Sequence, residues 1–423
     1  MTCKRTGRRP PERLRLQVES LAFGGDGVGH DADGRVVFLP GVAPGDEVEA
    51  TLVEAKKGYA RAELERVIRP SPERVAPPCP WFEAGCGGCQ WQHVALEAQQ
   101  QAKAEVVRRA LRHAGGEVRP LLAPAPAYGW RRRARLRWRG GVLGYAARRS
   151  HKLIDVPTCP QLEPPLEAAL QRLRAGLMGA LPASGELSLL LGGGGAVHAV
   201  LTGRGVRAAA EAARTLVGEA IAGIVLRDDE GVLTVGSGAI DLGDDEGGAP
   251  FWARADVFAQ VSAAGNMVLR RLVREAAAPL QGSRVLELHA GSGNFTRDLA
   301  AEAAELVAVE EASEAAALGR RNLEARRLRA DLRCQTALAA VSGLSAPVDV
   351  VVVDPPRTGL EPGLAEALAR LAPRRLVYVS CDPPTLARDL AALGMPLAHA
   401  TPVDLMPQTF HVEVVAVATR LPE

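Results

Sequence analysis

Apolar and polar positions alternate in short runs near the beginning of the chain. The runs are separated by turn residues, such as the Gly-Gly-Asp-Gly segment at residues 24–27. The alternating segments are residues 15–21, 35–39, 47–53 and 60–67. About five short strands this closely spaced are typical of a small β-barrel of the oligonucleotide-binding (OB) type. We therefore expect an OB-like barrel over residues 13–70. A barrel without a ligand is the alternative, because one fold hosts many functions.

In the last part of the chain, apolar runs alternate with helical periods. The expected strands are residues 284–290, 305–310, 331–335, 348–354 and 376–381, followed by 403–408 and 411–419 with no helix between them. Alternating strands and helices predict a doubly wound α/β sheet, and the final pair adds an antiparallel edge strand. Because an acidic, Gly-rich connection at residues 241–248 precedes this series, we expect the α/β domain to span residues 250–423.

The pattern between these two parts predicts a β-rich central domain over residues 71–249. A Pro-rich linker opens it, and an amphipathic helix over residues 94–114 is a candidate to pack on the α/β domain. A β-meander over residues 128–160 follows. Its alternation places four arginines on one face: Arg131, Arg133, Arg135 and Arg137. Such a row predicts a phosphate-binding face, and a solvated charged face is the alternative.

Composition narrows the class of protein without naming a partner. The 423 residues are 47% hydrophobic and 24% charged, which is an ordinary soluble composition. No apolar run approaches the about 18 residues of a membrane-spanning helix. The basic tail over residues 1–12 lacks the apolar core of a secretion signal, which favours the cytoplasm. We expect a monomer with no membrane partner. The net charge of +2 neither indicates nor excludes nucleic acid.

The cysteines predict a metal centre. Three are clustered as Cys79-x6-Cys86-x2-Cys89 among glycines, and Cys159 stands between two prolines farther along. In a chain without a secretion signal, such thiols favour metal binding over disulfides. Three clustered thiols and a distant fourth suit a [4Fe–4S] cluster. Zinc is the main alternative, because four thiolates also hold Zn²⁺. Radical chemistry on S-adenosylmethionine is a weaker alternative. It needs a cluster with one iron that has no cysteine ligand, and Cys159 would occupy that position.

Another thiol ends a buried strand. The apolar run before Cys381 is followed at once by Pro383 and Pro384, which predicts a strand end and a helix start. Ligand chemistry in open α/β sheets lies at the carboxyl ends of the strands. Cys381 is therefore a candidate nucleophile, with a buried and inert cysteine as the alternative.

A nucleotide-binding turn follows the first strand of the α/β series. Gly291 and Gly293 let the backbone approach a ligand, and Glu310, at the end of the second strand, can accept two ribose hydroxyls. Thr296 stands where a dinucleotide fingerprint has its third glycine. The turn therefore favours S-adenosylmethionine over NAD.

The motifs together resemble those of the RNA uracil-C5 methyltransferases. The match is closest to the branch that acts on bacterial 23S ribosomal RNA and carries a TRAM domain and an iron–sulfur cluster. The TRAM resemblance rests on the Gly-Gly-x-Gly turn and on residues 44–48 of the barrel. The catalytic motifs are residues 258–260, 289–296, 354–359, 380–386 and 407–413. The resemblance implies a class I (Rossmann-like) methyltransferase domain, an N-terminal TRAM barrel and a central iron–sulfur domain.

The resemblance also implies roles for individual residues. Cys381 is implied as the nucleophile and Glu413 as the general base. The positions implied to line the methyl-donor site are Gln260, His289, Asn294, Glu310 and Asp354. The implied partner is RNA, with ribosomal RNA favoured and transfer RNA open.

The chemistry of uracil explains these residue types. Carbon 5 is a poor nucleophile until a thiolate adds to carbon 6, and a base must later remove the carbon 5 proton. The target base must also leave its stack. A cytosine-C5 methyltransferase would carry a further cysteine after the Asp-Pro-Pro strand end, where Arg357 stands. A catalytically silent RNA-binding protein is a second alternative, opposed by the presence of both Cys381 and Glu413.

Overall fold

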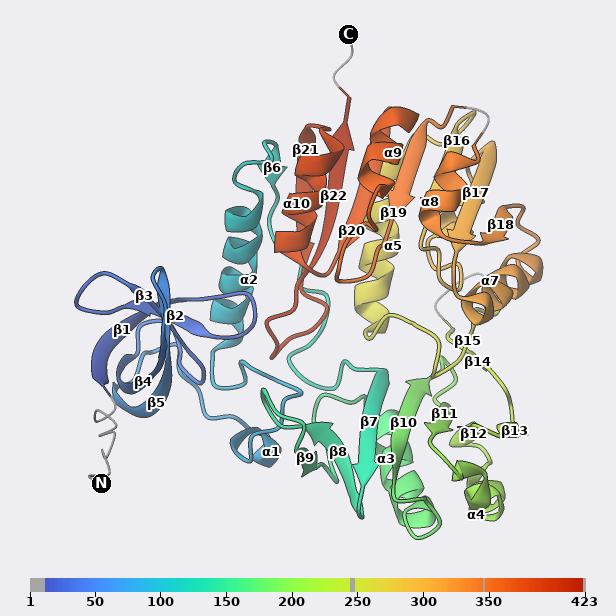
Figure 1. Cartoon of the computed structure of the whole chain (residues 1–423). Coiled ribbons are helices and arrows are strands. Elements are labelled where there is room, and N and C mark those ends of the chain that lie inside the picture. The colour runs from blue at the N-terminus through green and yellow to red at the C-terminus, as the bar shows by residue number, and fades with distance from the viewer. Residues whose placement is uncertain (1–11, 244–247, 345–346, 421–423) are drawn as a thin grey trace, which may run out of the picture.

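The computed structural model describes residues 12–243, 248–344 and 347–420, so all but the last residue of the expected basic tail lies outside the described residues. Figure 1 shows three lobes: a barrel, a central β-rich lobe and an α/β lobe. None of the helices in these described parts has the length and apolar character that crossing a bilayer requires.

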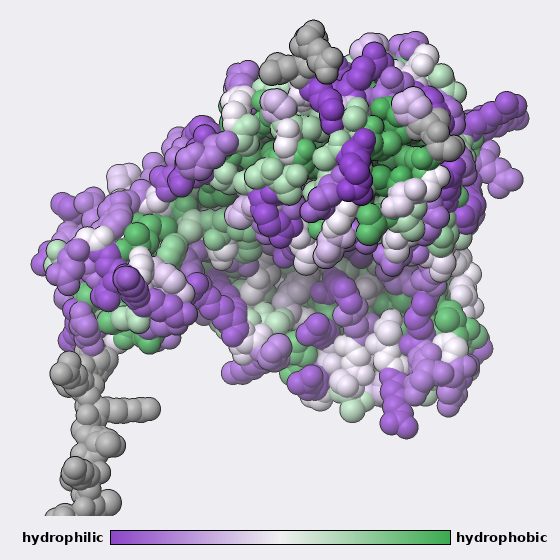
Figure 2. Space-filling model, turned by 45° about the horizontal axis from the view of Figure 1, so that its top comes forward, coloured by the Kyte–Doolittle hydropathy of each residue, from purple (hydrophilic) through white to green (hydrophobic). Residues whose placement is uncertain are grey.

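The first lobe is a closed five-stranded barrel in the order β1-β2-β3-β5-β4. Its strands are β1 (Arg13–Leu21), β2 (Gly27–His30), β3 (Val36–Leu39), β4 (Glu47–Ala55) and β5 (Tyr59–Arg69). Alternate side chains fill the interior, including Leu16, Val37 and Val48. The barrel projects from the rest of the molecule, and the face of it that Figure 2 shows carries mainly hydrophilic residues.

The central lobe is built on a seven-stranded sheet in the order β13-β12-β11-β10-β7-β8-β9. Its strands are β7 (Arg133–Arg139), β8 (Val142–Ala146), β9 (Leu153–Asp155), β10 (Ser184–Leu191), β11 (Val197–Thr202), β12 (Ile221–Asp228) and β13 (Gly231–Gly236). The helices α3 (Pro164–Leu177) and α4 (Ala210–Leu216) share a hydrophobic core with it. The expected meander is thus one part of a larger sheet. A short pair, β14 (Ile240–Asp241) and β15 (Trp252–Ala253), leads into the α/β lobe.

The α/β lobe contains an eight-stranded sheet in the order β18-β17-β16-β19-β20-β22-β21-β6. The strands are β6 (Glu117–Val118), β16 (Arg284–Leu288), β17 (Glu305–Glu310), β18 (Asp331–Cys334), β19 (Val350–Val353), β20 (Arg375–Ser380), β21 (Leu397–Val403) and β22 (Glu413–Thr419). The helices are α5 (Ala263–Ala277), α6 (Thr296–Leu299), α7 (Ser313–Ala325), α8 (Ala337–Ser342), α9 (Leu364–Leu371) and α10 (Pro383–Leu393). Strand β19 consists of four buried valines, as expected of a strand covered on both faces.

Two details of the expected sheet were wrong. The strand expected at residues 403–408 is mostly a loop, because β21 ends at Val403 and Asp404 turns away to an ion pair with Lys103. The antiparallel strand is β22, and it lies between β20 and β21 instead of at the edge. The edge is formed by β6, which pairs in parallel with β21.

One helix from the central part of the sequence belongs in space to the α/β lobe. Helix α2 (Leu96–Leu111) lies against α10, and the segment after it supplies β6 (Figure 1). Its buried positions include two polar side chains, Gln99 and Lys103, both fully enclosed. This helix therefore joins the central lobe to the end of the eight-stranded sheet.

Candidate functional site

Cys381 and Glu413 come together through the register of two antiparallel strands. Strand β20 pairs with β22 so that Ser380 is opposite Val414, which places the following residue, Cys381, opposite Glu413. Helix α10 begins directly after Cys381, where the Asp382 side chain accepts a hydrogen bond from the Thr385 N–H at 3.0 Å. A capped helix and a buried strand thus hold the thiol from both sides.

Burial changes the acid–base behaviour of both groups. Burial, and to a smaller extent the charge of Asp354, raises the pKa of the Glu413 carboxyl to about 8, against the opposing effect of the Arg357 guanidinium. Burial also raises the pKa of the Cys381 thiol to about 11, with Glu413 adding to the rise and Arg357 opposing it. At neutral pH both groups are largely protonated, so the thiol needs a proton acceptor or added positive charge to become a thiolate.

Arg357 is a functional candidate that sequence reasoning used only to argue against cytosine as the target. Its Nη2 atom lies 3.3 Å from Nε2 of His411. Burial and the nearby Arg357 charge lower the pKa of His411 to about 3, so the ring is neutral and can accept from the guanidinium. Arg357 follows the strand-end Asp354 by three positions, and its charge acts on the Cys381 thiol. Its place in the Asp-Pro-Pro-Arg motif was the available signal.

The loop that carries Arg357 is fixed by a buried carboxylate. Asp389 of α10 accepts from the Leu360 N–H at 2.8 Å and from the Tyr378 hydroxyl at 2.6 Å. Gly359 has φ +81°, and a Cβ there would meet the Asp389 Oδ2 atom at 2.2 Å. The close approach of Asp389 leaves no room for a side chain at residue 359, which explains the glycine there. The same contacts hold the loop so that the Arg357 guanidinium stays beside the Cys381 thiol.

A cavity lies at the carboxyl ends of β16 and β19. It is lined by four of the five residues expected to contact the methyl donor: Gln260, His289, Asn294 and Asp354. Burial raises the pKa of the Asp354 carboxyl to about 7 and lowers the pKa of His289, so the imidazole is neutral. Phe258 also lines this cavity and is 59% exposed, and the Arg133 guanidinium carbon lies 5.8 Å from the centroid of its ring.

The fifth expected residue, Glu310, stands beside this cavity and is not among its lining residues. Its carboxylate accepts from the N–H groups of Gly291 and Ala312, both at 2.8 Å. Gly291 has φ +57° and lies in the cavity wall. Glu310 therefore holds the nucleotide-binding turn in place in this structure.

Sequence reasoning missed Asn266. Its side-chain amide exchanges two hydrogen bonds with that of Asn294, at 3.0 and 2.8 Å. Asn266 lies on α5 and is buried, so it fixes the orientation of Asn294 in the cavity. An isolated asparagine in a helix carried no motif that could have marked it.

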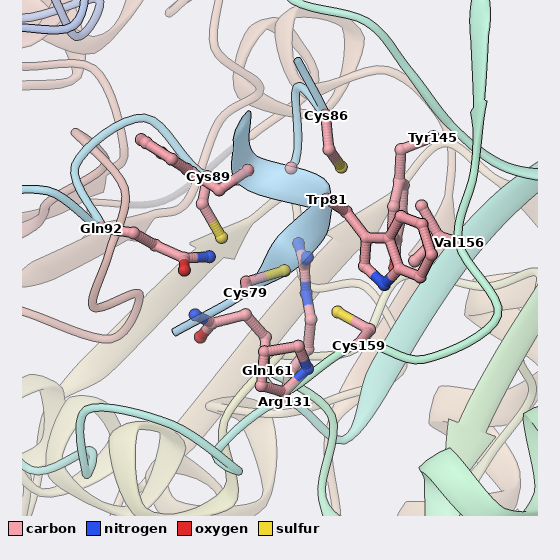
Figure 3. A pocket seen from close by; sticks show the side chains of 13 residues that line it. Cys79, Trp81, Cys86, Cys89, Gln92, Arg131, Tyr145, Val156, Cys159 and Gln161 are labelled. Carbon is pink, nitrogen blue, oxygen red and sulfur yellow. The ribbon is translucent and has the colours of Figure 1, made fainter. Parts of the chain in front are cut away.

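The four expected metal-ligating cysteines line one cavity in the central lobe. Their sulfur atoms point into a shared space (Figure 3), although they come from the 79–89 loop and from residue 159. Burial raises the pKa of Cys89 to about 11 and that of Cys159 to about 12, opposed by hydrogen bonds from the Gln92 side chain and the Gln161 backbone. Such thiols ionise only if a bound cation compensates for burial.

Polar groups around the same cavity have no hydrogen-bond partner among the described residues. They are Oη of Tyr145, Nε of Arg131 and both amide atoms of Gln161, and Figure 3 shows all three side chains at the cavity. Three of these atoms are donors, namely Oη of Tyr145, Nε of Arg131 and Nε2 of Gln161, and buried donors fit the sulfide and thiolate acceptors of an iron–sulfur cluster. Across the described parts of the chain, no three His, Cys, Asp or Glu side chains are grouped tightly enough for a single metal ion.

Strand β7 presents a row of arginines, but Arg131 is not part of it. Arg133, Arg135, Arg137 and Arg139 alternate with Ala134, Leu136 and Trp138, which are buried on the opposite face. Arg131 precedes the strand, and its side chain lines the cysteine cavity because its backbone bridges to Leu162. Arg137 and Arg139 line a surface groove together with His151.

Two protein families match separate parts of the chain. The TRAM domain family matches residues 8–64, and the family described as tRNA (Uracil-5-)-methyltransferase matches residues 251–420. The 23S rRNA (uracil(1939)-C(5))-methyltransferase RlmD of Pectobacterium atrosepticum is 35% identical, over 96% of this chain and 94% of the relative. That of Halomonas elongata is 35% identical, over 95% of this chain and 88% of the relative. The solved tRNA (uracil-54, C5)-methyltransferase of Pyrococcus abyssi, in complex with S-adenosyl-L-homocysteine, shares the fold with a TM-score of 0.77 at 23% identity, covering 96% of this chain and 100% of that one.

Proposed function

The chain belongs to the family of RNA (uracil-C5)-methyltransferases, and we propose that it methylates carbon 5 of a uridine in 23S ribosomal RNA. The observation that carries this proposal is the closeness of Cys381 to Glu413 at the end of the β20–β22 ladder, just beyond the Ser380–Val414 pair. Asp354 lies at the end of the neighbouring strand β19 and lines the cavity at the carboxyl ends of β16 and β19, so the thiol, the carboxyl group and the donor cavity share one edge of the sheet.

In the proposed reaction, S-adenosylmethionine supplies the methyl group from the cavity lined by Gln260, His289 and Asn294. The Cys381 thiolate forms a bond to carbon 6 of uracil, and the ring electrons move to oxygen 4. Carbon 5 of the resulting enolate then forms a bond to the methyl group, while the bond between that methyl group and the donor sulfur breaks and S-adenosylhomocysteine leaves. The Glu413 carboxylate removes the carbon 5 proton, and the carbon–sulfur bond breaks to release the thiolate.

The same arrangement assigns a task to Arg357. A guanidinium beside Cys381 lowers the pKa of the thiol, against the effect of burial. It therefore stabilises the thiolate both before addition and after elimination.

We propose that Cys79, Cys86, Cys89 and Cys159 hold a [4Fe–4S] cluster. The shared cavity and its unpaired donors support this assignment. The cluster would tie the 79–89 loop to residue 159 and act as a structural centre. Residues 13–70 would serve as the RNA-binding barrel, residues 71–249 as the cluster domain and residues 250–423 as the catalytic domain of a cytoplasmic monomer.

The reaction can be tested by trapping its intermediate. Glu413→Gln should transfer the methyl group and then stall as a protein–RNA adduct that carries the donor's label and survives denaturing electrophoresis. Cys381→Ala should give neither product nor adduct, and the double variant should give no adduct. Normal turnover of Cys381→Ala would refute the nucleophile. Nucleoside mapping of RNA from a deletion strain would show whether ribosomal or transfer RNA loses the methyl group.

A further inference from the structure

Gln408 holds an unfavourable backbone conformation in the loop between β21 and β22. Its φ is +68°, in the left-handed region that favours glycine, and its side chain is buried with 4% exposure. A residue other than glycine persists there only when its surroundings fix it. The loop begins after Val403 and ends at Glu413, and these two residues pair with each other.

The polar groups of Gln408 are bonded mainly to the segment that follows the cysteine loop. Its carbonyl oxygen accepts from the N–H groups of Gln90 and Trp91, both at 3.0 Å. Its own N–H donates to Oε1 of Gln99 at 2.8 Å, and its Oε1 accepts from Nε2 of Gln99 at 2.9 Å. Gln90 follows Cys89 directly, so one residue joins the cysteine cavity to the loop of the catalytic carboxyl group.

A second contact anchors the same loop to α2. Nζ of Lys103 donates to Oδ1 of Asp404 at 2.6 Å and to the carbonyl oxygen of Met406 at 3.0 Å. Both charged side chains are fully buried. The first half of the loop is therefore held from outside the sheet, whereas Cys381 is held by β20 and α10 within it.

We propose that Gln408 is a positioning residue through which helix α2 and the segment after the cysteine loop place Glu413 for proton removal. This inference rests on the proposed function, because it assigns a partner to the proposed general base. Since the contacts act on the loop of Glu413 and not on Cys381, their loss should slow elimination more than methyl transfer.

The test separates these two steps in a single turnover with labelled S-adenosylmethionine and an RNA fragment. Gln408→Gly keeps the left-handed backbone and removes the side-chain amide. Gln408→Asn also tolerates that backbone, but its amide is too short to reach Gln99. Both variants should transfer the methyl group within about threefold of the parent rate and resolve the adduct about 10- to 100-fold more slowly. This loss is a part of the about 10²–10⁴-fold by which a positioned general base accelerates proton removal. Iron content and S-adenosylmethionine affinity should not change.

Two comparisons exclude a general loss of stability. Leu170→Ala opens a cavity in the core of the central lobe, far from the loop, and should leave the ratio of the two rates unchanged. In a Glu413→Gln background, Gln408→Gly should have no further effect on elimination, because no base remains to be positioned.

Equal slowing of both steps, or elimination at the parent rate in both Gln408 variants, would overturn the inference. An additional slowing in the Glu413→Gln background would also overturn it. Failure of the proposed function has a different signature: the parent protein would then form no methylated uridine, and Glu413→Gln would trap no adduct.

Discussion

The raised pKa of Glu413 predicts a pH dependence of the elimination step alone. Burial and the charge of Asp354 place this pKa at about 8, against an ordinary value of 4.5. A general base acts only when ionised, so elimination should accelerate about tenfold per pH unit below pH 8 and level off above it. With that pKa, about 1% of Glu413 is ionised at pH 6 and about half at pH 8.

Substitution of the carboxyl group should remove this dependence. In Glu413→Gln, the adduct should decay about 10²–10⁴-fold more slowly than in the parent above pH 8, and with no rise between pH 6 and 8. Arg357→Gln should shift the rise to higher pH, because the guanidinium lowers the pKa of Glu413. The assay is rapid quenching of a labelled turnover at each pH, with adduct and released RNA separated on a denaturing gel.

Glu287 provides a matched control. It is also a buried carboxyl group in the same sheet, and burial raises its pKa to about 8. It lies in β16, so Glu287→Gln should keep the pH dependence of elimination. Elimination that is flat from pH 6 to 9 in the parent, or an unchanged rise in Glu413→Gln, would refute Glu413 as the base, and Asp382 would be the nearest candidate in sequence.

The remaining predictions concern the cluster, RNA binding and stability. Anaerobically purified protein should be brown and contain about four iron atoms per chain; stoichiometric zinc without iron would contradict this. Arg137→Gln with Arg139→Gln should weaken RNA binding and reduce the salt slope by about two units, whereas an unchanged slope would mean a solvated face. Lys103→Met should cost about 3–5 kcal/mol because it leaves a buried charge unpaired, and adding Asp404→Leu should restore much of this in denaturant titrations. Burial keeps Glu287 protonated in the folded protein up to about pH 8, whereas in the unfolded chain it ionises near its ordinary pKa of 4.5. The free energy of unfolding should therefore fall as the pH rises from about 4.5 to 8, and Glu287→Gln should remove at most about 5 kcal/mol of that fall.

Local chemistry made part of the site predictable from sequence. An apolar run, a cysteine and two prolines specify a strand end and a helix start without reference to distant residues, and the structure has both. Strand neighbours are not local, because alternation identifies a strand but not its partner. The position of β22 between β20 and β21 therefore escaped prediction, and so did its pairing of Glu413 with the residue after Ser380. Arg131 fits the alternation of its neighbours, yet a bridge to Leu162 turns it to the cysteine cavity.

The least predictable feature is the physical link between the two candidate centres. In the sequence, Cys89 and Glu413 belong to unrelated motifs. In the structure, Gln408 contacts Gln90, the residue after Cys89, and it precedes Glu413 by five positions. Addition, methyl transfer and proton removal are all polar steps that exchange no single electrons, so the proposed reaction gives a cluster no redox task. The loop that ends at Glu413 needs support from outside the sheet, and providing that support is a structural role for the cluster. The left-handed Gln408 and the buried Lys103–Asp404 pair are both costly alone. They are tolerated because the segment after the cysteines and helix α2 hold the loop from outside the sheet, and a cluster that fixes the 79–89 loop would thereby help to keep the catalytic carboxyl group beside the nucleophile.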